Sequence, residues 1–236
     1  MKLDALFIGS HPDDIELTCG GTVCKLVKSG KKVGIVDFTK GELSTRGNLA
    51  QRKKETEAAT KILGVEVRKN LGLKDGNIIN NYENRLKLIK IIREYQPEIV
   101  FAPFPSDRHP DHINASNFIR EAVFYSGLGK IVTGKLSAFR PKRIFYYRHA
   151  YDIPISFIMD VSDVFEKKIE AINCYNSQFY NTKHKGEPET YISSKRFLED
   201  VVVRAKFFGF KLGVEFGEPF FCYEDLKVDV DLLYKI

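Results

Sequence analysis

Short apolar runs alternate with longer amphipathic segments along the first half of the chain. Residues 3–9 and 31–39 contain apolar runs that are typical of buried strands. The segment between them, residues 17–30, has helical character and ends at Gly30, a suitable helix C-cap. These three segments together predict one β-α-β unit.

The alternation continues to about residue 125. Residues 48–64 and 81–97 place apolar side chains at helical spacing among charged ones, and Gly64 ends the first of these patterns. Further strands are predicted at residues 65–71 and 98–105, and a further helix at residues 110–125. Such alternation builds a mostly parallel sheet with helices on both faces. We therefore predict an α/β fold, a Rossmann-like three-layer sandwich whose site lies at the carboxyl ends of the strands.

The second half of the chain is less regular. Strands are predicted at residues 142–149, 155–161 and 215–223, and helices at residues 162–175 and 194–213. Ser162 is the expected N-cap of the first of these helices. Because no internal repeat or low-complexity linker marks a boundary, residues 1–236 are expected to form a single domain.

Composition narrows the class of protein. Its 236 residues, 43% of them hydrophobic, are enough for one compact domain. No apolar run approaches the roughly 18 residues of a membrane span. The N-terminal apolar stretch is too short, and too soon followed by acidic residues, for a secretion signal. We therefore expect a soluble, cytoplasmic protein with no membrane partner.

Charge and cysteine content exclude further kinds of protein and site. The net charge of +6 comes from scattered basic residues, so no nucleic-acid partner is expected; steep salt dependence of binding would reveal one. The excess is compatible with a small anionic substrate. The four cysteines show no CxxC spacing, which favours buried thiols over disulfides or metal ligands.

Charged residues gather directly after two of the predicted strands. Residues 8–21 read IGSHPDDIELTCGG, with one histidine and three acidic residues within six positions. The last of these, Glu16, is interpreted as a charge at a helix start. Residues 106–112 read SDRHPDH. Carboxyl ends of parallel strands share one edge of the sheet, so we expect the two loops to lie together.

A divalent cation bound by both loops would offset the repulsion between the carboxylates. Two imidazoles and one carboxylate, with a fourth position open to water, form a common catalytic zinc set, and ferrous iron suits the same donors. The candidates are His11, one of Asp13 and Asp14, and at least one of His109 and His112. The second aspartate is then a candidate general base, and the spare histidine a candidate oxyanion or leaving-group partner. Alternatively, the first motif is a turn whose aspartates cap the next helix.

Both motifs resemble the signature pair of the PIG-L/LmbE family of zinc-dependent N-acetylglucosamine deacetylases. The segments KGELSTRG, QRKKE, DRHPDH and PETYIS resemble more narrowly the N-acetylglucosaminyl-L-malate deacetylases of bacillithiol biosynthesis. The likeness extends from Phe7 to about Phe197. It implies a homo-oligomer, such as a hexamer, and a metal ion held by His11, Asp14 and His112.

The resemblance also implies roles for the residues around the metal. Asp13 is the implied general base, His109 the electrophilic or acid partner, and Tyr191 a support for the oxyanion. The implied substrate contacts are Arg52 on the sugar, and Arg108 and Arg46 on an anionic aglycone such as malate. Alternatively, Arg52 belongs to a solvated helix face and Tyr191 is an ordinary half-buried tyrosine. Asp107 is a candidate partner that orients a histidine.

The expected reaction is metal-assisted removal of the acetyl group from N-acetylglucosaminyl-L-malate, giving glucosaminyl-malate and acetate. Other N-acetylglucosaminides and chitooligosaccharides remain alternatives. A phosphoesterase is a further alternative, although two-metal sites usually need more carboxylates than these loops offer. A non-catalytic sugar- or nucleotide-binding domain is another, but IGSHPDD stands where such domains carry a glycine-rich phosphate loop.

Overall fold

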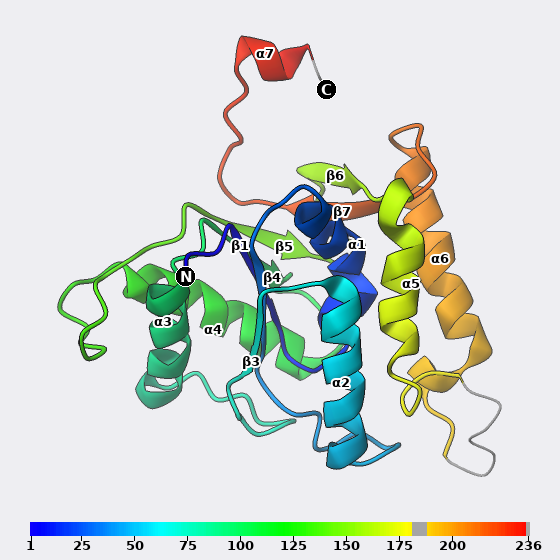
Figure 1. Ribbon diagram of the computed structural model, residues 1–236, viewed down its shortest axis with the longest axis horizontal. Helices are drawn as coiled ribbons and strands as arrows, with labels where there is room; N and C mark the ends of the chain where they lie inside the picture. The colour runs from blue at the N-terminus through cyan, green and yellow to red at the C-terminus, as the bar shows by residue number, and fades with distance from the viewer. Residues whose placement is uncertain (181–187, 235–236) are drawn as a thin grey trace.

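A seven-stranded sheet forms the centre of the computed structural model, which describes residues 1–180 and 188–234 (Figure 1). The strand order is β3-β2-β1-β4-β5-β7-β6. The parallel strands are β1 (Ala5–Gly9), β2 (Val33–Asp37), β3 (Val67–Asn70), β4 (Ile99–Pro103) and β5 (Arg143–Tyr147). β7 (Gly217–Phe221) runs antiparallel to both β5 and β6 (Phe157–Asp160). The sheet is therefore mostly parallel, as predicted.

Helices cover both faces of the sheet, which makes three layers (Figure 1). One layer contains α1 (Asp14–Lys28), α2 (Leu49–Leu63), α5 (Phe165–Asn173) and α6 (Lys195–Phe210). The other contains α3 (Tyr82–Tyr95) and α4 (Pro110–Ser126). Three short helices complete the described chain: η1 (Ser162–Val164), η2 (Tyr191–Ser193) and α7 (Val230–Leu233). The α/β prediction is confirmed, and each strand and long helix lies where the sequence pattern places it.

The pleat of the strands divides the core between the two layers. Phe7 packs in the cluster beneath α1 and α5, whereas its neighbour Ile8 packs in the cluster beneath α3 and α4. Both side chains are fully buried. Successive strand residues point to opposite faces, so a strand buried on both faces reads as the continuous apolar run seen in the sequence.

Local capping fixes several helix ends. The Asn48 side chain accepts the backbone N–H of Gln51 at the start of α2, and Gly64 ends that helix with φ at 72°. The predicted cap at Ser162 is wrong. Ser162 begins η1 instead, and its hydroxyl bonds to the Asp160 carboxylate at 2.7 Å, so it is not free to cap α5.

α1 is kinked at Cys19, and a buried ion pair supports the kink. The Glu218 carboxylate on β7 accepts the backbone N–H groups of Gly21 at 3.0 Å and Thr22 at 2.7 Å. Lys168 on α5 pairs with the same carboxylate at 2.6 Å. A Cβ on Gly21 would lie 2.9 Å from the Glu218 carboxylate, so this glycine permits the close approach.

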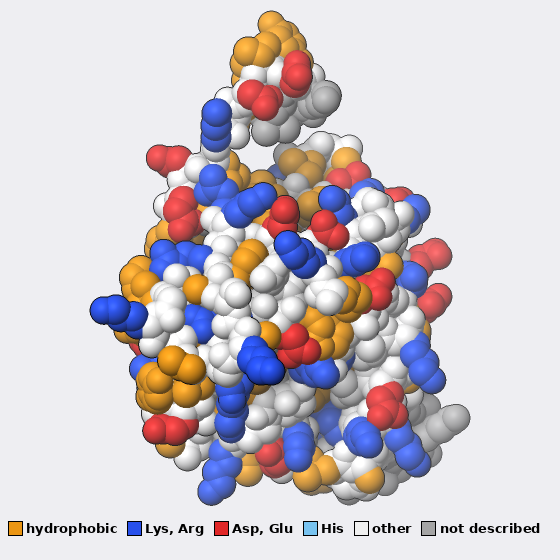
Figure 2. Space-filling view, turned by 60° about the vertical axis from the view of Figure 1, so that its left-hand side comes forward, with side chains coloured by type: hydrophobic (Ala, Val, Ile, Leu, Met, Phe, Trp, Pro, Cys, Tyr) orange, Lys and Arg blue, Asp and Glu red, His pale blue; other side chains and the backbone are white. Residues whose placement is uncertain are grey.

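The surface shows no single dominant charge on the face in Figure 2. Basic side chains are mixed with acidic ones there, and the segment after β7 carries the exposed apolar residues of α7 away from the body. Among the described residues, no helix is both long and apolar enough to cross a bilayer.

Candidate active site

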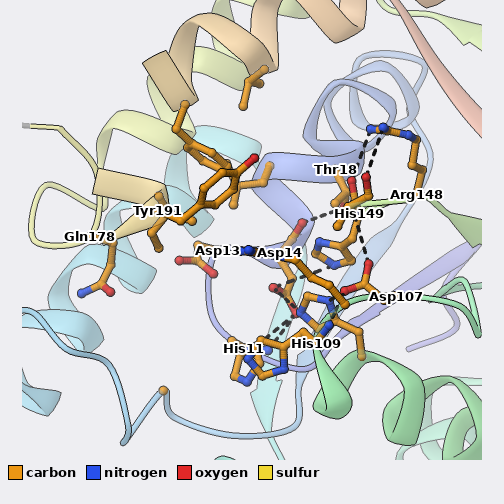
Figure 3. A pocket seen from close by; sticks show the side chains of 18 of the residues that line it. His11, Asp13, Asp14, Thr18, Asp107, His109, Arg148, His149, Gln178 and Tyr191 are labelled. Carbon is orange, nitrogen blue, oxygen red and sulfur yellow. Dashed lines mark hydrogen bonds and ion pairs between the residues drawn. The ribbon is translucent and has the colours of Figure 1, made fainter. Parts of the chain in front are cut away.

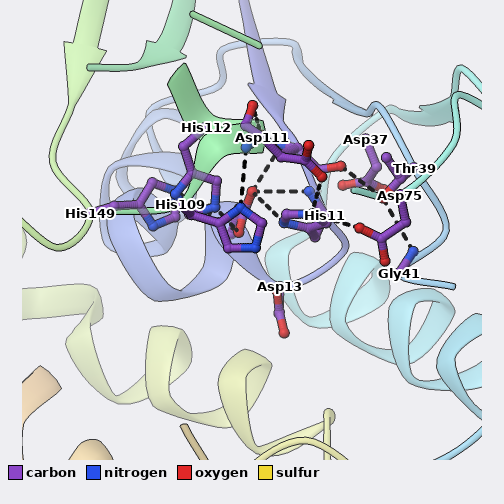
Figure 4. Close-up of polar contacts among 12 residues, drawn as sticks. His11, Asp13, Asp37, Thr39, Gly41, Asp75, His109, Asp111, His112 and His149 are labelled. Carbon is purple, nitrogen blue, oxygen red and sulfur yellow. Dashed lines mark hydrogen bonds and ion pairs between the residues drawn. The ribbon is translucent and has the colours of Figure 1, made fainter. Parts of the chain in front are cut away.

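The two charged loops meet at the carboxyl edge of the sheet, because they follow the neighbouring strands β1 and β4 (Figure 4). The first loop leads into α1, which begins at Asp14, and the second leads into α4, which begins at Pro110. The ring centroids of His11 and His112 are 5.6 Å apart. The predicted convergence of two segments about one hundred residues apart is therefore present in the structure.

Asp14 lies at the centre of the cluster and is held rigidly. Its Oδ2 atom accepts the backbone N–H groups of Ser10 at 2.8 Å and His11 at 2.9 Å. Burial raises the pKa of Asp14, but the charges of His112 and His149 and hydrogen bonds from His11 and His112 hold this pKa well below its usual range. Asp14 is therefore a carboxylate at neutral pH.

Each of the two imidazoles offers one nitrogen to Asp14 and the other to a second carboxylate. His11 Nδ1 lies 3.7 Å from Asp14 Oδ2, while its Nε2 lies 3.1 Å from Asp75 and 3.2 Å from Asp111. His112 Nε2 lies 3.5 Å from Asp14 Oδ1, while its Nδ1 lies 3.0 Å from Asp107. Metal-binding histidines usually have such carboxylate partners, which fix the ring and its tautomer.

These donors suit a metal ion. One potential ligand atom from each of His11, Asp14 and His112 lies within 4.8 Å of the others. Burial lowers the pKa of His112, but Asp14 and Asp107 raise it overall to about 9, and the carboxylates around His11 likewise raise its pKa. The cluster thus requires positive charge, which a bound cation supplies in place of protons.

A second group of three potential ligands, formed by His11, His109 and Asp111, suits a metal less well. Asp111 Oδ2 already accepts the N–H of Gly76 at 2.8 Å and contacts His11 Nε2. His109 Nδ1 accepts the N–H of Asp111 at 3.2 Å. Because these donor atoms are already engaged, the first group is the better cation site.

Asp13 stands apart from the chelating group and faces the cavity (Figures 3 and 4). It is buried, its φ is 111°, and its Oδ2 lies 3.3 Å from Arg52 Nη1. Burial raises the pKa of Asp13 to about 7; Arg52 opposes this shift and Asp14 adds to it. A carboxyl group with a pKa near 7 suits a general base at neutral pH, and such non-glycine backbone geometry is common at active sites.

His109 caps α4 and borders the cavity. Because its Nδ1 accepts a backbone N–H, the neutral ring carries its proton on Nε2. Burial and the charges of His11 and His112 lower the pKa of His109, which favours this neutral form. His109 can therefore donate one hydrogen bond from Nε2.

A cavity of about 710 Å³ opens over these groups and is large enough for a small glycoside. Arg52 is buried in its wall, and its Nε and Nη1 atoms have no hydrogen-bond partner among the described residues. Arg108 lies 4.3 Å from the ring centre of Tyr191, which is 59% exposed. Arg46 also lines the cavity, and its backbone carbonyl accepts the Gln178 amide. The structure thus brings all nine predicted site residues to one cavity.

The sequence reasoning missed His149. It follows β5, stacks on His112 with ring centroids 3.9 Å apart, and places Nε2 3.9 Å from Asp14. Burial and His112 lower the pKa of His149 to about 3, so it is neutral. Because β5 adjoins β4, its position at the same carboxyl edge is the signal that could have found it. The partners Asp75 and Asp111 were missed as well.

The interpretation of Glu16 as a charge at a helix start is confirmed, since Glu16 lies in the first turn of α1, but its side chain does more than face the helix dipole. Glu16 is fully buried, pairs with Arg68 at 2.5 Å and accepts the Tyr175 hydroxyl at 3.1 Å. Arg68 also binds Asp37 at the end of β2. The network joins α1 to the sheet directly beside the aspartates.

Comparisons with known proteins agree with this geometry. A family model described as "PIG-L: GlcNAc-PI de-N-acetylase" matches residues 6–123. Diacetylchitobiose deacetylase of Thermococcus kodakarensis is 34% identical over 189 residues, which cover 74% of this chain and 69% of that protein. The probable N-acetyl-alpha-D-glucosaminyl L-malate deacetylase 2 of Bacillus anthracis is 28% identical over 188 residues, covering 74% and 80%.

Among solved structures, the conserved protein TT1542 from Thermus thermophilus superposes with a TM-score of 0.87 at 35% identity. That superposition covers 96% of this chain and 97% of the other. The family match spans half of the chain and includes both charged loops. The chain therefore belongs to the PIG-L family of deacetylases.

Proposed function

We propose that this protein is a metal-dependent hydrolase that removes the N-acetyl group from an N-acetylglucosaminyl conjugate. The observation that carries the proposal is the convergence of His11, Asp14 and His112, with Asp13 left free beside them. A chelating group next to an unchelated carboxylate is the arrangement that amide hydrolysis by an activated water needs. We further propose that residues 1–236 form one deacetylase domain.

His11, Asp14 and His112 would hold the ion, which we propose is Zn²⁺, with Fe²⁺ as the alternative. Two imidazoles and one carboxylate suit either ion and leave a coordination position open. When bound, the metal polarises a carbonyl group and lowers the pKa of water in its coordination shell. Asp75, Asp111 and Asp107 would keep the two imidazoles in their binding orientation.

The remaining steps follow from the chain's own side chains. Asp13 takes a proton from the water whose oxygen forms the new bond to the acetyl carbon. Negative charge then develops on the carbonyl oxygen, where the Nε2–H of His109 or the hydroxyl of Tyr191 donates a hydrogen bond. The C–N bond breaks, a proton passes to the departing nitrogen, and the products are acetate and a free amine.

The arginines of the cavity are proposed substrate contacts. Arg52 is buried beside Asp13, with which its Nη1 forms an ion pair at 3.3 Å. Its Nε has no hydrogen-bond partner among the described residues, so it can donate to a sugar hydroxyl group. Arg108 and Arg46 lie farther along the wall, where they would meet the aglycone. We propose N-acetylglucosaminyl-L-malate as the substrate, in bacillithiol biosynthesis. Chitooligosaccharides are the alternative, since relatives are named for each substrate.

We also propose a homo-oligomer, such as a hexamer, that acts in the cytoplasm. Val203, Phe207 and Phe210 are exposed apolar residues on α6, and burying such side chains against another copy is favourable. Light scattering coupled to size-exclusion chromatography measures the oligomeric state. A monomer at micromolar concentration would contradict this part of the proposal.

The function is tested by measuring amine and acetate release from a panel of N-acetylglucosaminides, with and without a chelator. The panel includes N-acetylglucosaminyl-L-malate, N-acetylglucosamine and N,N′-diacetylchitobiose, and p-nitrophenyl phosphate serves as a phosphoesterase control. We expect release of acetate that the chelator abolishes and that added metal restores. Phosphate release alone, or sugar binding without turnover, would contradict the proposal.

A further inference from the structure

Part of the cavity is not used by the proposed mechanism, and we refer to it as the second lobe. It lies between α1, α6 and the segment after β5, and its wall includes Thr18, Arg148, Ala150, Arg204, Ala205 and Phe208. Arg148 and Thr18 both line the cavity, and Figure 3 shows Arg148 on the side of the cavity away from His11. The lobe therefore continues the reaction site and is accessible to a bound ligand.

Arg204 is the first of two cations in this lobe. It is half-buried on α6, its Nε donates to the backbone carbonyl of Asp200 at 3.1 Å, and its guanidinium lies 5.9 Å from the Phe197 ring centre. Within the described part of the chain, no carboxylate lies at ion-pair distance from Arg204. Its two terminal amino groups are thus left for another partner.

Arg148 is the second cation, and its position is fixed. Its terminal amino groups donate to the backbone carbonyls of His149 at 3.3 Å and Ala150 at 3.4 Å. Its Nε pairs with Asp152 at 3.0 Å, but Asp152 is 90% exposed, so water screens this pair. The positive charge of the guanidinium is therefore only weakly compensated, while its hydrogen bonds fix its orientation.

The two guanidinium groups repel each other across the lobe. Burial and the charge of Arg148 lower the pKa of Arg204. The buried acid of the same lobe, Glu218, is already paired with Lys168. Two half-buried cations that line one cavity and lack a buried counter-ion among the described residues are costly unless an anion joins them.

We propose that Arg148 and Arg204 form a carboxylate-binding subsite in this lobe. A guanidinium binds a carboxylate through two parallel N–H donors, and a preoriented fork loses little freedom on binding. The carboxylate has two sources: an anionic aglycone of the substrate, or the acetate released by the reaction. The identity of the carboxylate, as aglycone or as acetate, depends on the proposed deacetylase function. The existence of the subsite depends only on Arg148 and Arg204.

The subsite is tested by direct binding, which needs no turnover. L-Malate and acetate are titrated by calorimetry into the purified metal-loaded protein and into the variants Arg148→Gln, Arg204→Gln and the double variant. Each single variant is expected to weaken binding about tenfold, the effect of losing a charged hydrogen-bond partner. Lys206→Gln, an exposed change on the same helix, is the control and should bind as the wild type does.

Steady-state kinetics separates the two sources. If the subsite binds the aglycone carboxylate, Arg204→Gln should lower kcat/KM for N-acetylglucosaminyl-L-malate about tenfold. The value of kcat/KM for N,N′-diacetylchitobiose, which has no carboxylate, should not change. If the subsite instead binds the released acetate, product inhibition by acetate should be weaker in Arg204→Gln, and by the same factor with both substrates. Arg204→Lys keeps the charge and should recover part of the binding if the glutamine variant folds poorly.

Unchanged affinity of the folded double variant for both L-malate and acetate would overturn the subsite. A different result would separate the subsite from the proposed function. If the wild type binds a carboxylate, the variants do not, and no substrate yields acetate, then the subsite is supported and the proposed function is refuted.

Discussion

Replacing Asp13 with asparagine removes the proposed general base with little change in shape. Asp13 has φ at 111°, a conformation that asparagine tolerates better than most residues, so the backbone is expected to stay in place. The asparagine retains the side-chain volume beside Arg52 but cannot accept a proton from water. Alanine would be a poorer choice, because it would add backbone strain and leave a gap.

The expected loss follows from the role of the group. General-base catalysis contributes about 10²- to 10⁴-fold in rate, which corresponds to about 3–5 kcal/mol of activation free energy. We expect Asp13→Asn to lower kcat by that factor with little change in KM or in bound metal. Stability should not fall, because burial of the ionised Asp13 carboxylate is unfavourable, as its pKa of about 7 indicates.

The assay is acetate release from the best substrate of the panel, measured from pH 5 to 9. The base acts as a carboxylate, so wild-type kcat/KM should rise as pH increases through about 7, where Asp13 loses its proton. The variant should lack this rise. A variant with kcat within about threefold of wild type and the same pH dependence would refute the assignment of Asp13 as the base.

Two further predictions concern the support of the site. Lys168→Met leaves Glu218 buried without its cationic partner, since the two side chains are only 3% and 2% exposed. The free energy of unfolding measured in urea should fall by about 3–5 kcal/mol. A fall of less than about 1 kcal/mol would show that the ion pair does not stabilise the packing of α1. Asp107→Ala frees His112 Nδ1 and should weaken metal affinity about 10- to 100-fold in a competition titration; unchanged affinity would mean that Asp107 does not orient the ring.

Most of the fold was predictable from local patterns. Apolar runs such as residues 3–9 marked buried strands, and Asn48 with Gly64 bounded α2. Ser162 was misread because a serine before an apolar pattern is equally able to bond a nearby aspartate. The structure decides between these roles: Asp160, two residues earlier, accepts the Ser162 hydroxyl, and tertiary contacts bring the backbone N–H of Phe216 to the same hydroxyl.

The position of the candidate site was predictable, because the parallel sheet determines which loops lie together at its carboxyl edge. His11 and His112 were placed together because β1 and β4 end at the same edge. The side-chain orientations were not predictable, since they depend on partners elsewhere in the chain, such as Asp75 for His11. His149 and Arg148 were missed because residues 142–149 read only as a strand, although β5 ends at the same edge.

The buried acid Glu16 shows a different limit. A glutamate two positions into a helix ordinarily lies in solvent and interacts with the helix dipole. Its burial depends on Arg68 of β3 and Tyr175 beyond α5, residues far away in sequence. Long-range ion pairs of this kind leave no pattern in a single sequence.

The proposed mechanism requires that the two loops hold one divalent ion while Asp13 remains outside its coordination. Inductively coupled plasma mass spectrometry measures the metal content of wild type, His11→Ala and Asp13→Asn after reconstitution and dialysis. We expect about one zinc or iron ion per chain in wild type and in Asp13→Asn, and a loss of most of this metal in His11→Ala. Undiminished metal content in His11→Ala, or loss of the metal in Asp13→Asn, would show that these residues do not have the proposed roles.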